Sequence, residues 1–158
     1  AAGLAAPLAG IGHPPLSWDE VAGTWVSGWH SELERFSARE LNSRFRRRFG
    51  RRLDTDGWAA WAALKMLAEG VVRAEGVDTP SLIRYFESAP RFDGHKGEAL
   101  TFRAWDHQLG QPVYVLDARK REPGSERREP LGVVAQVPAP GEALDAIGVG
   151  KEETPCRF

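Results

Sequence analysis

The alternation of apolar and polar side chains predicts four short strands. Residues 99–103 place Leu100 and Phe102 on one face, which is the period-two pattern of a half-buried strand. Residues 113–116 are β-branched and aromatic and follow Pro112, an imino acid that is tolerated where a strand begins. Residues 21–29 and 131–137 are similarly rich in β-branched side chains, so each is expected to hold one further strand.

Three helices are predicted between the first of these strands and the central pair. The first is expected from about Ser31 to Phe49, ending at Gly50, with one apolar stripe formed by Leu33, Phe36, Leu41, Phe45 and Phe49. The second starts at a cap within residues 54–56 and ends at Gly76. The third begins at residues 78–80, where a capping residue precedes a proline, and stops before Pro90. These helices are expected to pack on the strands.

The remaining segments divide the chain into three predicted parts. Residues 1–20 are rich in small residues and proline and are expected to be irregular. Residues 21–118 carry the predicted helices and central strands and form one α/β domain. Residues 119–158 form a charged loop and a C-terminal tail, which includes the strand at 131–137 and a short helix at residues 142–147.

Composition narrows the classes of function. A chain of 158 residues with a net charge of −1 is the size of one domain, and this charge argues against nucleic acid or an anionic membrane as partner. The arginine cluster, Arg44, Arg46, Arg47, Arg48, Arg51 and Arg52, is either a phosphate-binding patch or a solvated helix end. The solvated end is favoured because acidic residues elsewhere nearly balance the charge.

Two features bear on the cellular compartment. The single cysteine, Cys156, permits no internal disulfide and so gives no sign of an oxidising compartment. The opening residues 1–12 are too short to span a bilayer and lack the basic flank of an intact signal peptide. A processed N-terminus, a linker and the cut end of something longer all remain open readings of this stretch.

Catalysis is the least supported class. No G-x-S-x-G elbow accompanies a histidine, and neither a P-loop nor a G-x-G-x-x-G phosphate loop occurs. The spacing of Asp93, His95, Asp106 and His107 matches no dedicated metal motif, so these are interpreted as turn residues. The sequence therefore predicts no catalytic residue, no metal and no cofactor.

The strongest candidates for a polar and aromatic contact site are Trp105, Asp106 and Gln108. An indole, a carboxylate and an amide at these positions can bind a ligand, or they can hold the backbone of a hinge, which is slightly favoured. Trp29 and His30 are further candidates. Trp25, Trp29 and Trp105 are also expected to form an exposed aromatic surface, whereas Trp58 and Trp61 share a helix face and are expected to belong to the core.

Several spaced motifs resemble those of type I periplasmic solute-binding proteins of the branched-chain amino-acid type. These motifs are Trp58-Ala-Ala-Trp61, the D-G-x-K-G of residues 93–97, and Pro112-Val-Tyr-Val. The phrase FRAWDHQLGQP at residues 102–112 is most similar to a branch associated with pyrroloquinoline-quinone-dependent alcohol oxidation. The resemblance covers roughly residues 21–118. It implies a two-lobed α/β fold, with helices on a small, mostly parallel sheet, that closes on a solute in the periplasm and delivers it to a membrane permease.

The departures from that family define two hypotheses. Complete relatives are more than twice as long, Gly110 stands where the branch has arginine, and nothing matches from Lys120 onward. The chain is thus expected to be a partial or shortened fold of this type. The first hypothesis is a non-enzymatic solute-binding domain linked to alcohol oxidation. The alternative is an accessory subunit that binds a protein partner in a larger redox complex or an oligomer; neither hypothesis requires nucleic acid or a membrane span.

Overall fold

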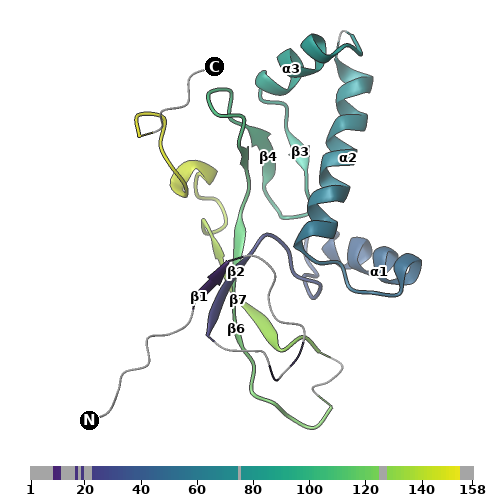
Figure 1. The fold of residues 1–158 in the computed structure, drawn as a ribbon, viewed down its shortest axis with the longest axis vertical. Helices are drawn as coiled ribbons and strands as arrows, with labels where there is room; N and C mark the ends of the chain where they lie inside the picture. The colour runs from purple at the N-terminus through teal and green to yellow at the C-terminus, as the bar shows by residue number, and fades with distance from the viewer. Residues whose placement is uncertain are drawn as a thin grey trace.

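The computed structural model describes residues 9–11, 17, 19, 23–74, 76–124 and 128–153 (Figure 1). Its helices gather in one half of the molecule with β3 and β4, and a second sheet occupies the other half. In chain order the elements are β1 (Ala9–Ile11), β2 (Thr24–Ser27), α1 (Ala38–Phe49), α2 (Thr55–Arg73), α3 (Thr79–Glu87), β3 (Phe92–Asp93), β4 (Ala99–Phe102), β5 (Leu109–Gly110), β6 (Val113–Ala118), β7 (Leu131–Val137) and a 3₁₀ turn (Leu144–Ala146).

The strands form two small sheets that are mainly antiparallel. One sheet has the order β1-β2-β6-β7, and within it only the pair β1 and β2 is parallel. The other sheet, β3-β4-β5, is antiparallel throughout. The prediction of a mostly parallel sheet is therefore wrong. Parallel neighbours need a crossover connection, whereas β6 and β7 are consecutive strands whose connecting loop simply reverses the chain.

The capping residues set the ends of the helices as predicted. The carboxylate of Asp54 accepts a hydrogen bond from the Gly57 N–H at 2.8 Å, and Asp78 accepts one from the Ser81 N–H at 3.0 Å. Gly50 closes α1 in the left-handed conformation, at a φ of 68°. Among the described residues, no helix is both long and apolar enough to cross a membrane.

The first helix begins later than predicted, at Ala38 rather than near Ser31. Phe36 and Ser37 have φ values of 55° and 64°, which a right-handed helix cannot accommodate. Two members of the predicted apolar stripe are consequently not core residues, because the side chains of Phe36 and Phe49 are 52% and 61% exposed. Periodicity alone does not detect the break at Phe36.

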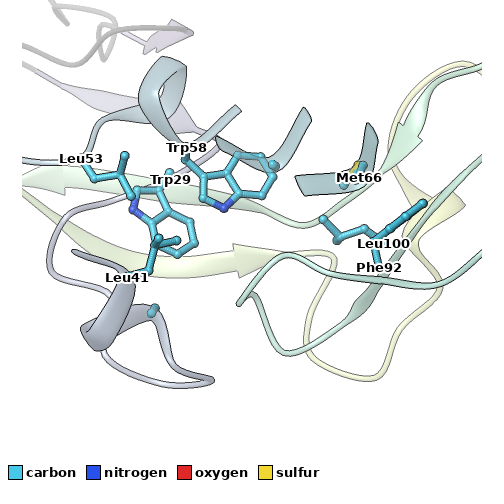
Figure 2. Packing of buried hydrophobic residues seen from close by; sticks show 9 residues of the cluster. Trp29, Leu41, Leu53, Trp58, Met66, Phe92 and Leu100 are labelled. Carbon is cyan, nitrogen blue, oxygen red and sulfur yellow. The ribbon is translucent and has the colours of Figure 1, made fainter. Parts of the chain in front are cut away.

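The main core lies where α2 meets α1, β3 and β4 (Figure 2). Trp29 and Trp58 stack with their ring centroids 5.7 Å apart, and Leu100 is completely buried. The core role predicted for Trp58 is confirmed, whereas the exposed surface expected to include Trp29 is wrong, since Trp29 is 1% exposed. A second, smaller cluster in the larger sheet contains Tyr114, Leu116 and Leu131.

Candidate functional site

A cavity of about 380 Å³ opens between the loop after β2, the turn after β3 and the strands β6 and β7. We call it the Lys96 pocket. Its lining residues are His30, Glu32, Leu33, Glu34, Arg35, Phe36, His95, Lys96, Tyr114, Arg119, Val133, Gln136 and Pro140. The pocket thus draws on both halves of the molecule and combines ionisable groups with apolar side chains.

Lys96 lies in the wall of this pocket and is almost completely buried, with 1% of its surface exposed. Its Nζ donates hydrogen bonds to Gln111 Oε1 at 2.6 Å and to the Pro112 carbonyl at 3.0 Å. The same nitrogen lies 3.8 Å from the ring centroid of Trp58 and 5.6 Å from that of Tyr114. A short turn between two strands thereby fixes a cation against both an aromatic core and the strand linker.

Burial shifts the protonation of two groups in the pocket. Burial lowers the pKa of Lys96 to about 7, because the ammonium loses its hydration. Burial also raises the pKa of Tyr114 to about 12, so its phenol stays neutral at physiological pH. The amine of Lys96 is therefore the group in this pocket whose charge changes near neutrality.

His30 and Glu129 form a buried pair beside the pocket. The Nδ1 of His30 accepts a hydrogen bond from the Glu32 N–H at 3.3 Å, which leaves the proton on Nε2, 3.3 Å from Glu129 Oε2. Ser31 donates its hydroxyl to the same carboxylate, and Arg52 lies 3.8 Å from it. Burial raises the pKa of Glu129, but its contacts with His30 and Ser31 outweigh burial and hold the pKa below its usual value.

A second ion pair, between Glu32 and Arg119, forms part of the pocket wall. Arg119 Nη2 lies 2.5 Å from Glu32 Oε2. Burial raises the pKa of Glu32, and the hydrogen bond and charge of Arg119 more than compensate, so that the pKa is lowered. Gly132 makes room for the guanidinium, because a Cβ at Gly132 would lie 2.4 Å from Arg119 Nε. The pocket therefore presents a fixed carboxylate and a fixed guanidinium side by side.

Glu129→Gln is expected to lower the free energy of unfolding at pH 7 by about 1–3 kcal/mol, because His30 and Arg52 then face an uncharged amide. The lowered pKa of Glu129 means that its ionised form stabilises the fold above its ordinary pKa, and this contribution disappears as the pH falls through its lowered pKa. Urea unfolding between pH 7 and pH 4 should thus show a steeper acid loss for the wild type than for the variant. Exposed Glu152 provides the control Glu152→Gln, and equal acid profiles for all three proteins would contradict the assignment.

The structure places Trp105, Asp106 and Gln108 in a turn that closes around Arg103. The Arg103 guanidinium donates to the carboxylate of Asp106, at 3.1 Å from Nε, and to the side chain of Gln108. It also lies over the Trp105 ring, 4.3 Å from its centroid. Gln108 and Arg103 line a separate cavity of about 170 Å³ next to the 3₁₀ turn. These contacts hold the turn together, as the hinge interpretation requires, and a ligand role for the three residues stays a prediction.

The five predicted site residues do not meet in one place. Trp29 is part of the core, where its Nε1 donates to Asn42 Oδ1 at 2.9 Å. His30, the next residue, lines the Lys96 pocket. Trp105 and its neighbours belong to the turn around Arg103. His30 is therefore the only one of the five that lines this pocket.

The other charged residues considered in the sequence are distributed over several surfaces. His95 stacks on Trp61 at 5.2 Å, and His107 Nε2 lies 2.9 Å from Glu87 Oε1. Among the described residues, no three potential ligands (His, Cys, Asp or Glu) gather as a metal ion would need. In the arginine cluster of 44–52, Arg52 approaches the buried Glu129 and Arg51 pairs with Asp54 at 2.8 Å. Part of that cluster therefore stabilises the fold.

Sequence reasoning missed most of the residues that build the pocket. Lys96, Tyr114, Glu32, Arg119 and Glu129 were not singled out. One signal was available, because Lys96 stands between Gly94 and Gly97 in the D-G-x-K-G motif, where a compact turn directs its side chain inward. Glu129 gave no such signal, since it ends a charged loop that otherwise reads as solvated.

A family model described as "Periplasmic binding protein" matches residues 4–123 of this chain. The match covers about three quarters of the sequence and includes α1 to α3, β6 and the D-G-x-K-G turn. Comparison with curated proteins found no significant match.

Three solved structures share the fold at low sequence identity. An ABC-type branched-chain amino acid transporter from Rhodopseudomonas palustris CGA009 is 20% identical, with a TM-score of 0.72, and the match covers 94% of this chain and 39% of that chain. An amino acid ABC transporter substrate-binding protein from Pseudomonas fluorescens Pf-5 gives 15%, 0.71, 90% and 36%. A periplasmic binding protein from Burkholderia mallei gives 19%, 0.67, 86% and 34%. This chain therefore spans little more than a third of the length of the solved structures it resembles.

Proposed function

Because the chain belongs to the periplasmic binding protein family, we propose that the Lys96 pocket binds a small polar solute. The observation that carries this proposal is the arrangement of Lys96, Glu32 and Arg119, three ionisable groups held in fixed positions around a cavity that connects both halves of the molecule. Solute sites of this kind are typically concave, with a few convergent polar groups among apolar ones.

An amino acid is the solute class that the pocket chemistry fits best. Its carboxylate would find cations in Arg35, Arg119 and protonated Lys96, and its ammonium would find a carboxylate in Glu32 or Glu34. An apolar side chain would contact Leu33, Phe36 and Val133. The printed names of two of the related structures, which refer to amino acids and branched-chain amino acids, support the same class.

The proposal predicts ligand-dependent stabilisation of the isolated chain. The pocket is open and the chain spans little more than a third of its solved relatives, so we expect a dissociation constant in the millimolar range. At ten times that constant, a ligand should add about 1.4 kcal/mol of stability and raise Tm by roughly 3 °C. Thermal unfolding with a panel of amino acids, small carboxylic acids and alcohols measures this shift, and a flat panel would argue strongly against the proposal.

A matched pair of arginine variants tests the location of the site. Arg35 lies at the pocket and Arg44 lies on the exposed surface of α1, so Arg35→Ala should reduce the ligand-induced shift and Arg44→Ala should leave it unchanged. Both side chains are exposed, and neither variant should alter the stability of the unliganded chain by more than about 0.5 kcal/mol. Equal loss of the shift in both would place the ligand elsewhere.

In this proposal the chain acts without catalysis, in the periplasm, and presents its solute to a membrane permease. The link to pyrroloquinoline-quinone-dependent alcohol oxidation depends on the phrase at residues 102–112 alone and stays a prediction. The predicted boundaries of the solute-binding part, residues 21–118, also stay a prediction. The alcohols in the panel test the link, because binding of an alcohol and of no amino acid would favour it.

The alternative, an accessory subunit that binds a protein partner, is favoured by one observation. Large apolar side chains remain exposed on α2, among them Leu64 at 69% and Val72 at 83%. Exposed apolar surface of this kind is typical of protein interfaces. Co-purification of a stable partner would support this alternative.

A further inference from the structure

Helix α2 has two apolar faces, and only one of them is buried. Its inner face packs in the core through Trp58, Ala62, Met66 and Gly70. At 3.6 residues per turn, the opposite face consists of Ala60, Ala63, Leu64, Leu67, Ala68 and Val71, all exposed. Lys65 and Glu69 form an ion pair at 2.6 Å beside the inner face, so they do not interrupt the outer one.

No described element covers this outer face. Figure 1 shows β3 and β4 on one side of α2 and no strand or helix of the described chain along the other side of its middle turns. A helix that is apolar on both faces normally lies between two layers. Outer positions of a helix at a protein surface are usually polar, so the outer face of α2 calls for a partner.

The spacing of the outer face matches a helix-pairing seam. Ala60, Leu64, Leu67 and Val71 follow each other at intervals of four, three and four residues, which is the repeat of paired helices. The face is also symmetric about the point between residues 65 and 66. Leu64 mirrors Leu67, Ala63 mirrors Ala68 and Ala60 mirrors Val71.

We propose that two copies of this chain associate through the outer faces of α2, packed antiparallel around a two-fold axis. In that arrangement Leu64 of each copy meets Leu67 of the other, and the small side chains of Ala63 and Ala68 let the helices approach closely. The internal symmetry of the seam is what an isologous interface requires. Antiparallel helix dipoles also attract each other.

The length of α2 sets the strength of this association. Nineteen residues form a helix of roughly 28 Å, a seam smaller than a standard protein interface. We therefore expect a dimer with a dissociation constant in the micromolar range. Sedimentation equilibrium of the 158-residue chain, between about 1 and 500 μM, should show a monomer that converts to a dimer.

Disulfide trapping tests the antiparallel register. Leu64→Cys and Leu67→Cys are each prepared in a Cys156→Ser background and mixed under mild oxidation. The mixed disulfide should form at least severalfold faster than either homodisulfide. A parallel pair would instead favour the two homodisulfides, and that result would overturn the proposed register.

Charge substitution tests the face itself. Leu67→Lys should weaken the dimer at least tenfold, whereas Val134→Lys, at a site on β7 that is 63% exposed, should leave it unchanged. Circular dichroism and Tm establish that both variants remain folded. A chain that is monomeric at 500 μM, or a dimer weakened equally by both substitutions, would overturn the proposal, as would protection of α2 by another part of a longer polypeptide.

Discussion

Trp58→Ala is expected to lower the free energy of unfolding by about 3–5 kcal/mol, a large part of the stability of a domain of this size. Trp58 is 2% exposed and stacks on Trp29, and its Nε1 donates a hydrogen bond to the Gly94 carbonyl at 3.1 Å. Truncation would empty the centre of the core and leave that carbonyl without its partner. Urea unfolding followed by far-UV circular dichroism measures the loss.

Trp61→Ala provides the matched control, three residues further along the same helix. Trp61 is only half-buried and stacks on His95 at 5.2 Å, so its removal should cost less than half as much. If the two variants lost equal stability, the core would not be centred on the pair of Trp29 and Trp58.

Local chemistry explains why the helices and one strand were predictable. The carboxylates of Asp54 and Asp78 reach backbone N–H groups three residues ahead, so the sequence near each helix start determines its position. The strand at Leu131–Val137 is likewise confirmed at the predicted residues. In each case the decisive contacts lie within a few residues along the chain.

Long-range pairing explains what the sequence did not reveal. Val26 on β2 pairs with Val115 on β6, and neither segment carries a mark of its partner or direction. The mostly parallel sheet was expected from a resemblance to longer proteins, whereas the strands described in this chain pair mainly antiparallel. The break at Phe36 escaped detection for a different reason, since an aromatic residue at positive φ has no signature in a hydrophobic pattern.

The candidate site shows the same division. His30 was singled out, but its buried partner Glu129 lies 99 residues later in a segment that reads as a charged loop. Lys96 belongs to a recognisable turn, yet only the folded chain brings its amine to Gln111, Pro112 and the Trp58 ring. Burial of a charged side chain is a property of the tertiary structure and leaves no mark in the composition.

Lys96 is expected to make the protein more stable as the pH rises above 7. Its ordinary pKa is 10.5 and burial lowers it to about 7 in the folded chain, so the unfolded chain holds a proton that the folded chain releases. The free energy of unfolding should therefore rise by roughly 1–2 kcal/mol between pH 7 and pH 9.5. It stays below the largest possible gain because the Trp58 ring and two hydrogen-bond acceptors favour the ammonium.

The opposite shift of Tyr114 limits the upper end of this window. Its pKa rises from 10.0 to about 12 on folding, so above pH 10 the unfolded chain loses a proton that the folded chain keeps, and stability falls again. Unfolding experiments should consequently show a maximum near pH 9.5 to 10. Lys96→Met removes the rising limb and leaves the decline above pH 10.

Lys65→Met is the control for this substitution, because Lys65 is a partly exposed lysine whose Nζ pairs with Glu69 at 2.6 Å. Its removal should leave the rise between pH 7 and pH 9.5 intact. A Lys96→Met variant that keeps the full rise would show that the amine remains charged when buried. In that case the Trp58 face, Gln111 and Pro112 replace its hydration completely, and the pocket carries a permanent positive charge toward its solute.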